Sequence, residues 1–278
     1  MYLCVGVVSS CSMTHVASRQ GSTCTVSPVL GVYTAAIIFI HGLGGSCEHM
    51  QDKALELGKE LPHVKFVMPS ATNMRTVFSL GRSIPSWYHI FGRTEWLNRY
   101  SPGIESSRTV IDNLIKEEID QHNIPASRIV VGGFSQGAAL SLYTGLQWSG
   151  SSEPLGAAVC LSGYLPATNV FNMTDQGRQT PIFHAHGARD SLVTMEMAQM
   201  TKAEIERHSH GGRYQFNVYP DLDHSIQEEE TRDLISFLKG VLPAILANSQ
   251  GNASGASSAY SAGLVALLTW VYLLLWDC

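Results

Sequence analysis

Hydrophobic residues lie along the chain in short apolar runs that alternate with longer amphipathic segments. The apolar runs predict strands at residues 35–40, 65–68, 128–131, 157–161 and 182–186, and alternation of residue types predicts another at residues 213–219. The amphipathic segments predict helices at residues 48–60, 105–122, 136–148, 195–207 and 227–242. Because strands that alternate with helices build βαβ units, the pattern predicts an α/β fold with a mainly parallel central sheet and helices on both faces.

The ends of the chain differ in composition from this alternating part. Residues 32–247 are expected to form one domain, which is long enough to bury a sizeable core. Residues 1–31 are interpreted as an N-terminal extension. Residues 248–258 form a Gly/Ser/Asn linker, and residues 259–276 form an apolar stretch of about 18 residues, enough to cross a bilayer core.

Ser135 lies in the sequence Gly-Phe-Ser-Gln-Gly, directly after one predicted strand and directly before a predicted helix. A serine at such a tight turn takes an unfavourable backbone conformation, so the residues two positions away on either side must be small. Gly133 and Gly137 meet this requirement. The segment is therefore interpreted as a nucleophile elbow, and a glycine-rich turn with a buried serine is the alternative.

A catalytic serine of this kind needs an acid and a histidine, which come from loops after later strands. Asp190 follows the predicted strand at residues 182–186, and His224 follows the predicted strand at residues 213–219. We therefore predict that Ser135, Asp190 and His224 form a catalytic triad.

Other acids and histidines compete for these roles. Asp221 and Asp223 lie too close to His224 in the sequence to orient it from a separate loop, and Asp223 is expected to cap the last helix or face solvent. His184 and His186 alternate on one strand, but no carboxylate or cysteine lies near them at the spacing of a metal site. Structural roles are expected for both histidines.

The developing oxyanion requires fixed backbone N–H donors. An early apolar strand ends in His41-Gly-Leu-Gly-Gly, whose amides can point inward, and the second donor is expected from the residue after the nucleophile. The N–H groups of Leu43 and Gln136 are therefore predicted to form the oxyanion hole. His41 is expected to brace this loop, and a phosphate-binding loop is excluded because no Lys-Ser/Thr pair follows the glycines.

Several separated motifs together resemble the acyl-protein thioesterases of the phospholipase/carboxylesterase family, over roughly residues 32–243. They are His-Gly-Leu-Gly at 41–44, Pro-Ser-Trp-Tyr at 85–88, Gly-Gly-Phe-Ser-Gln-Gly at 132–137, His-Gly at 186–187 with Asp190, and His-Ser at 224–225. The chain departs from the family at Gly45, where an acid is usual, at Ala138, where a glycine is usual, and near Asp221, where a glycine is usual.

The resemblance implies an α/β-hydrolase that cleaves thioesters of fatty-acylated cysteines in proteins, with the same triad and the same oxyanion hole. Action as a lysophospholipase or general carboxylesterase is the alternative, and a non-catalytic lipid-binding protein is an alternative of another class. The acyl chain is expected in an apolar groove formed by aromatic and aliphatic loops, with Ile84, Pro85, Trp87 and Leu165 as substrate-binding residues. Trp87 is the best candidate for a wall of this groove.

Composition narrows the choice of partners. The net charge is −5 and no basic stripe is present, so nucleic acid is not expected as a partner. The chemistry requires neither a metal nor an organic cofactor. Six cysteines show no spacing typical of a disulfide framework or a zinc site, which favours a reducing compartment. Cys160 is expected to be buried, and Cys47 to be accessible.

The location follows from the termini. We expect a cytoplasmic, membrane-associated protein, held by the C-terminal apolar stretch as a tail anchor. Acylation of Cys4 and Cys11 could add reversible attachment. A cell-surface protein with a glycolipid anchor is the alternative, and it requires a signal peptide. The N-terminal apolar run is at the short limit for a signal peptide, and no basic n-region precedes it. Only then would the sequons at Asn172 and Asn252 be used.

Overall fold

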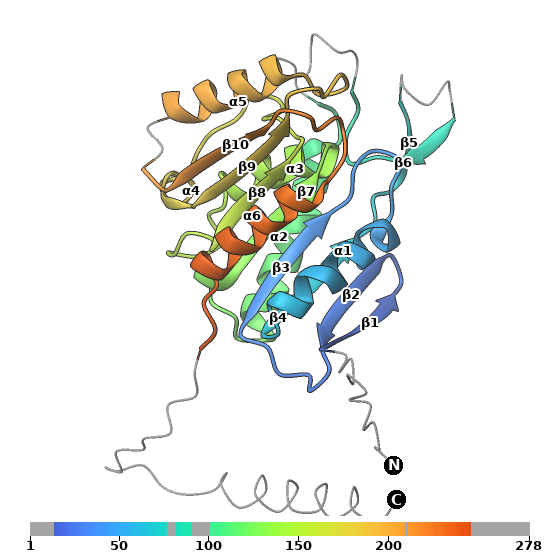
Figure 1. Cartoon of the computed structure of the whole chain (residues 1–278), viewed down its shortest axis with the longest axis vertical. Helices are drawn as coiled ribbons and strands as arrows, with labels where there is room; N and C mark the ends of the chain where they lie inside the picture. The colour runs from blue at the N-terminus through green and yellow to red at the C-terminus, as the bar shows by residue number, and fades with distance from the viewer. Residues whose placement is uncertain (1–13, 77–81, 91–100, 209–210, 246–278) are drawn as a thin grey trace, which may run out of the picture. The chain divides into compact units, whose positions relative to one another are not determined.

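A computed structural model of the chain describes residues 14–76, 82–90, 101–208 and 211–245. Its centre is an eight-stranded sheet in the order β1-β2-β4-β3-β7-β8-β9-β10 (Figure 1). The strands from β4 to β10 in this order pair in parallel, so the expected mainly parallel sheet is confirmed. Their bounds are β3 (Ala35–Ile40), β4 (Val64–Pro69), β7 (Ile129–Phe134), β8 (Ala157–Leu161), β9 (Ile182–Gly187) and β10 (Tyr214–Tyr219).

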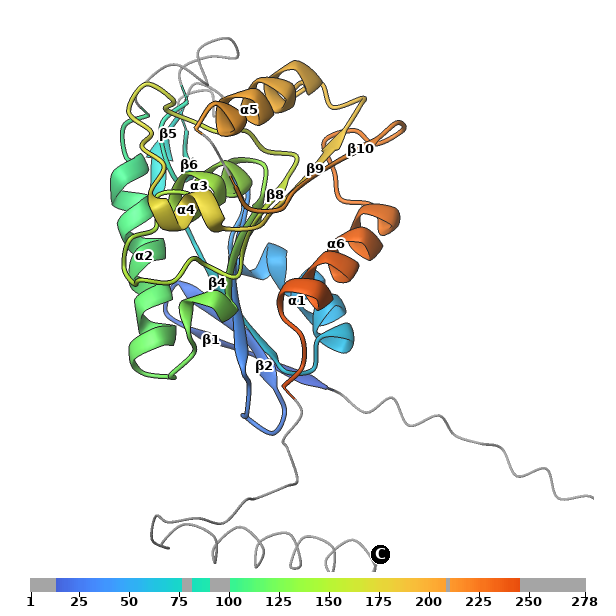
Figure 2. The same ribbon diagram turned by 90° about the vertical axis from the view of Figure 1, so that its left-hand side faces the viewer.

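Helices cover both faces of the sheet (Figure 2). Every residue of β3 is buried, and alternate side chains enter the two cores on opposite faces. One core includes α1 (Cys47–Glu60) and α6 (Glu228–Val241), and the other includes α2 (Ile104–Asp120), α3 (Gln136–Gly145) and α5 (Met195–Arg207). Burial on both faces explains why these strands are continuous apolar runs in the sequence. Parallel strands also bring their carboxyl ends to one edge, where such folds place their sites.

The sheet extends further toward the N-terminus than the expected domain boundary at residue 32. β1 (His15–Gln20) and β2 (Thr23–Pro28) form an antiparallel hairpin, and β2 pairs antiparallel with β4. Alternate residues of β2 are buried, and the His15 Nε2–H donates to the carbonyl of Val64 over 2.8 Å. The assignment of all residues up to 31 to an extension is therefore corrected. Small polar side chains hid the period-two pattern of β2.

The cysteine prediction is also corrected. Cys24 on β2 and Cys47 at the start of α1 form a disulfide, and both residues are fully buried. The expectation of an accessible Cys47 without a disulfide is therefore wrong, because the pairing joins a strand to a helix across 23 positions and no sequence spacing reveals it. Cys160 is buried as expected, and burial raises the pKa of its thiol.

Loss of this disulfide is expected to lower the free energy of unfolding by about 3 kcal/mol, because a closed loop of this length restricts the unfolded chain. Urea denaturation of the Cys24→Ser variant, compared with wild type under oxidising conditions, measures the difference. Adding a reductant should destabilise wild type by a similar amount and leave Cys24→Ser unaffected. Equal stability of the two proteins without reductant would contradict the pairing.

Smaller elements complete the described part of the chain. They are the two-stranded sheet of β5 (Asn73–Arg75) and β6 (Ser83–Pro85), the short helix α4 (Asp175–Gln179), and a 3-10 turn at Ala126–Arg128. Contacts group the described residues up to Ala244 into one compact unit. No helix among the described residues has the length and hydrophobicity to cross a membrane. The predicted linker and apolar stretch, Cys4 and Cys11 lie outside the described residues.

Candidate active site

Ser135 occupies a sharp turn between β7 and α3. Its φ of 55° and ψ of −119° lie outside the regions that side chains favour, and such strain costs on the order of 1–3 kcal/mol. The Ser135 N–H donates to the carbonyl of Leu161 on the neighbouring strand over 2.9 Å, and α3 begins at the next residue. The turn therefore presents the hydroxyl at the carboxyl edge of the sheet.

The two glycines of the turn are required by close packing. A Cβ on Gly133 would lie 2.5 Å from the carbonyl oxygen of Ile40, and one on Gly137 would lie 2.2 Å from the same oxygen. Neither position has room for a side chain. The prediction that both residues must be small because strand and helix approach closely is thereby supported by direct distances.

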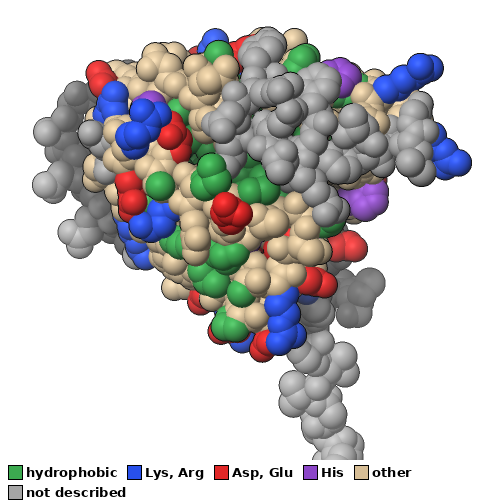
Figure 3. Space-filling view, turned by 90° about the horizontal axis from the view of Figure 1, so that it is seen from above, with side chains coloured by type: hydrophobic (Ala, Val, Ile, Leu, Met, Phe, Trp, Pro, Cys, Tyr) green, Lys and Arg blue, Asp and Glu red, His purple; other side chains and the backbone are tan. Residues whose placement is uncertain are grey.

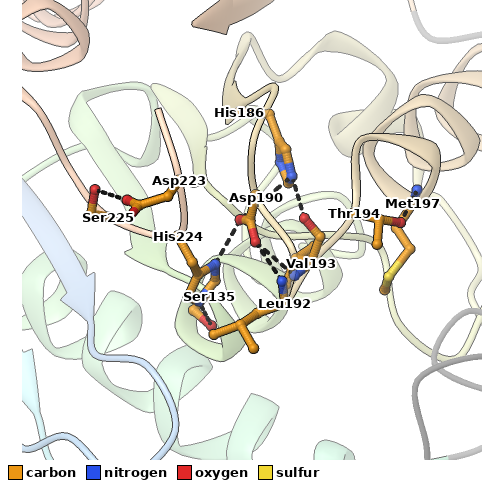
Figure 4. A network of polar contacts seen from close by, with 10 residues as sticks. All are labelled: Ser135, His186, Asp190, Leu192, Val193, Thr194, Met197, Asp223, His224 and Ser225. Carbon is orange, nitrogen blue, oxygen red and sulfur yellow. Dashed lines mark hydrogen bonds and ion pairs between the residues drawn. The ribbon is translucent and has the colours of Figure 1, made fainter. Parts of the chain in front are cut away.

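The three residues expected to act together form one hydrogen-bonded chain (Figure 4). The Ser135 Oγ lies 2.8 Å from Nε2 of His224, and the His224 Nδ1 lies 2.7 Å from Oδ2 of Asp190. His224 rests against the ring of Phe134, with the ring centroids 4.9 Å apart. The order of contacts fixes the tautomer, since Nδ1–H donates to the carboxylate and Nε2 can accept the serine proton.

Asp190 is buried and firmly held. Its Oδ1 accepts the N–H groups of Leu192 and Val193, each over 2.9 Å. Burial opposes ionisation, but the hydrogen bonds from His224, Val193 and Leu192 outweigh it, so the pKa of Asp190 lies below its ordinary value. The carboxylate is therefore charged at neutral pH and orients the imidazole.

Among the described residues, the two other candidate acids of the triad contact groups other than His224. Asp223 is exposed and accepts a hydrogen bond from the Ser225 hydroxyl over 2.5 Å (Figure 4). It does not cap the last helix, which begins at Glu228 after the N-cap residue Gln227. Asp221 is exposed and pairs with Arg189 over 2.6 Å. Of the two roles expected for Asp223, exposure to solvent is the one observed.

The two histidines of β9 have structural contacts. The His186 Nε2–H donates to the Val193 carbonyl over 2.8 Å, which ties down the loop that holds Asp190. His184 is fully buried and contacts the Tyr214 hydroxyl through Nδ1 over 2.9 Å. Burial, with a smaller effect of His186, lowers the pKa of His184 to about 3, so this ring is neutral.

The loop after β3 lies against the nucleophile elbow. Gly44 N–H donates to the Pro85 carbonyl over 2.8 Å, and Gly45 N–H donates to the Gly42 carbonyl over 3.0 Å. Among the described residues, no backbone acceptor is found for the N–H groups of Leu43 and Gln136. The first N–H groups of a helix have no partner within it, which leaves that of Gln136 able to bind an anion.

His41 holds this loop in place, as expected. Its Nδ1–H donates to the Gly42 carbonyl over 2.7 Å, and its Nε2 accepts the Ala71 N–H over 3.0 Å. Burial lowers the pKa of His41, which favours the neutral ring that both contacts require. The Trp87 indole N–H donates to the His41 carbonyl over 2.8 Å, and the two rings lie 5.0 Å apart.

The Gln136 side chain is a site residue whose contacts the sequence did not indicate. Its Oε1 accepts the Trp87 N–H over 3.1 Å, and its Nε2 donates to the Tyr88 carbonyl over 2.8 Å and to the Ser86 hydroxyl over 3.1 Å. The buried amide therefore fixes the 86–88 segment to the start of α3. A glutamine directly after the nucleophile was the only signal available for this role.

An apolar cavity of about 330 Å³ opens beside Ser135. Hydrophobic side chains are also grouped at the centre of the face seen in Figure 3. Aliphatic and aromatic side chains dominate the cavity walls, which suits an acyl chain. The described residues that line it are Gly42, Leu43, Ile90, Phe134, Ser135, Gln136, Tyr164, Leu192, Val193 and His224.

None of the four predicted groove residues is among these lining residues. Trp87 is only 2% exposed, and its indole N–H braces the loop after β3, so its assignment as a wall is corrected. Leu165 is fully buried, and its N–H donates to the Thr201 hydroxyl. Ile84 and Pro85 lie on β6, beside Gly44. Ile90 and Tyr164, which lie close to Trp87 and Leu165 in the sequence, line the cavity instead.

Comparisons with known proteins identify the family of the chain. The model of the phospholipase/carboxylesterase family matches residues 26–242. The chain belongs to this family. Acyl-protein thioesterase 1 of Mycosarcoma maydis is 36% identical over 239 residues, covering 80% of this chain and 98% of the relative. Acyl-protein thioesterase 1 homolog 1 of Dictyostelium discoideum is 32% identical over 212 residues, covering 76% and 92%.

Solved structures agree. The crystal structure of Zea mays acyl-protein thioesterase 2 matches with a TM-score of 0.66 and 26% identity, covering 80% of this chain and all of that one. Arabidopsis thaliana SOBER1 matches with a TM-score of 0.65 and 25% identity, covering 75% and 99%. The α/β-hydrolase fold is therefore confirmed, as is the prediction of an enzyme that hydrolyses carboxylic esters or thioesters.

The departures from the usual family pattern have physical consequences in this member. A Cβ at Gly45 would lie 2.9 Å from Nδ1 of His41, so the usual acid cannot fit without a shift of the loop. The extra methyl group of Ala138 lies opposite Gly163, where an added Cβ would approach it to 2.5 Å. The absence of a side chain at Gly163 therefore makes room for Ala138.

Proposed function

We propose that the protein is a serine hydrolase that removes long-chain acyl groups from S-acylated proteins. The observation that carries the proposal is the hydrogen-bonded chain of Ser135, His224 and Asp190, which opens on an apolar cavity. The acyl-protein thioesterases among its relatives point to thioesters as the bonds that are cleaved.

In the proposed mechanism His224 takes the proton of Ser135, and the serine oxygen attacks the acyl carbonyl. The carbonyl oxygen becomes an oxyanion, which the N–H groups of Leu43 and Gln136 stabilise. Asp190 stabilises the protonated imidazole. The carbon–sulfur bond then breaks with its electron pair on sulfur, and His224 returns the proton to give a free thiol. Water repeats the attack on the acyl-enzyme and releases the fatty acid.

Comparison of two substrates with the same acyl chain tests the proposal. The protein should hydrolyse an S-palmitoyl peptide with a higher kcat/KM than palmitoyl lysophosphatidylcholine. Higher turnover of the lysophospholipid would instead assign the alternative of lysophospholipase or general carboxylesterase. Failure of a fluorophosphonate probe to label the protein, together with no turnover of either substrate, would favour a non-catalytic lipid-binding protein.

We also propose that the apolar stretch at residues 259–276 attaches the protein to a membrane, since it carries no charged residue. A chain ended after residue 248 keeps every proposed site residue. It should lose membrane partition in a vesicle flotation assay and hydrolyse a soluble short-chain thioester as fast as the full-length protein. Continued flotation would place the attachment at the N-terminal cysteines or the acyl cavity. Loss of activity would show that the stretch belongs to the catalytic fold.

The cytoplasm and the cell surface are the two alternatives for the compartment of this protein. The Cys24–Cys47 disulfide favours an oxidising compartment, because such bonds are rare in reducing ones. Asn172 is exposed and lies in a glycosylation sequon. Mass determination of the native protein before and after removal of N-linked glycans therefore distinguishes the two locations.

A further inference from the structure

A second cavity, of about 370 Å³, also reaches the catalytic histidine. It shares Gly42, Leu43, Phe134 and His224 with the cavity beside Ser135. The remaining residues that line it are His41, Gly45, His49, Met50, Ser225 and Ile226.

The two cavities extend toward opposite faces of the sheet. Ile90, Tyr164 and Val193 of the first belong to the core that includes α2, α3 and α5. Met50 on α1 belongs to the other core, and Ile226, just before α6, packs against it. The rings of Phe134 and His224, 4.9 Å apart, line both cavities. A substrate bound across Ser135 thus meets two separate spaces.

If the proposed function holds, the two cavities receive different parts of the substrate. The cavity that contains Ser135 and Gln136 receives the acyl group, because its carbonyl must reach both the hydroxyl and the oxyanion hole. The leaving sulfur must lie beside Nε2 of His224, which returns the proton to it. The second cavity adjoins His224 but is not lined by Ser135, and it continues along Ser225 and Ile226.

We propose that this second cavity binds the peptide segment that flanks the acylated cysteine. Met50, Phe134 and Ile226 offer apolar contacts, while His49 and Ser225 are exposed and offer polar ones to a peptide backbone. The described lining residues include no Lys or Arg, and the exposed carboxylate of Asp223 lies next to Ser225. The lining therefore offers no cationic side chain to the phosphate of a lysophospholipid, and it suits a peptide segment as the leaving group.

Two thioesters with one acyl chain and different leaving groups test the proposal. One carries N-acetylcysteamine, and the other carries a heptapeptide with a central cysteine. Ile226→Trp fills the second cavity and should lower the ratio of kcat/KM, peptide over small thiol, by at least about tenfold, mainly through KM. Leu192→Trp is the matched control in the acyl cavity. It should lower kcat/KM for both thioesters and keep their ratio within about threefold.

The outcomes separate this inference from the proposed function. If wild type cleaves both thioesters but Ile226→Trp leaves their ratio unchanged, the leaving-group assignment is wrong and the thioesterase proposal stands. If wild type cleaves neither, the thioesterase proposal itself is wrong. Ile226→Phe provides a smaller filling side chain should the tryptophan variant not fold, and the same fall in ratio is expected. An equal loss on both substrates for Ile226→Phe would also overturn the assignment.

Discussion

Replacing Ser135 with alanine is expected to abolish covalent labelling by a fluorophosphonate probe and to lower kcat by several orders of magnitude. In the proposed mechanism this hydroxyl attacks the substrate, and no other hydroxyl contacts His224 among the described residues. Only the oxyanion hole and the binding cavity would then remain to accelerate hydrolysis. Labelling followed by mass spectrometry, and turnover of a soluble thioester, measure the two effects.

The fold should survive this change, because the bond to His224 is the one side-chain hydrogen bond of Ser135 among the described residues. The thermal unfolding midpoint of Ser135→Ala should therefore stay at or above that of wild type. The alanine loses the hydrogen bond to His224 but leaves no hydroxyl without a partner at this turn. Labelling that persists at another serine would remove Ser135 from the role of nucleophile.

Asp190→Asn is expected to lower kcat by roughly 10³ to 10⁴, because the amide stabilises the imidazole tautomer that cannot accept the serine proton. Asp190 is the carboxylate within 2.7 Å of Nδ1 of His224. The matched control is Asp223→Asn, one residue before His224, whose carboxylate contacts Ser225 instead. It should change kcat by less than about tenfold. Steady-state kinetics on the soluble thioester compare the two.

The pH dependence adds a second readout to the same pair of variants. The pKa of Asp190 lies below its ordinary value in the folded protein, so its hydrogen bonds stabilise the fold above the carboxyl's ordinary pKa. That stabilisation is lost as the pH falls through the lowered value. In Asp190→Asn, the free energy of unfolding should lack this fall at acid pH, whereas Asp223→Asn should retain it. The opposite ranking in kcat would move the acid of the triad to Asp223.

The sequence by itself determined the parts of this protein whose physics is local. Buried parallel strands require continuous apolar runs, and β3, β7, β8 and β9 could be located for that reason. A strand-to-helix turn with no room for a Cβ requires the glycines around Ser135. These glycines allowed the turn to be predicted from the sequence. The order of Ser135, Asp190 and His224 along the chain followed from where such a sheet places its loops.

Only the tertiary structure decided contacts between distant segments. The Cys24–Cys47 disulfide depends on β2 lying beside the start of α1, and no spacing encodes that approach. Trp87 is a residue type that suits a groove wall. Its backbone N–H donates to Gln136 and its indole N–H donates to the His41 carbonyl, and these bonds turn the ring into the interior. An apolar residue in the sequence is compatible with both a cavity wall and a core. The fold sets the partners of its polar atoms, and these partners determine which of the two places the residue takes.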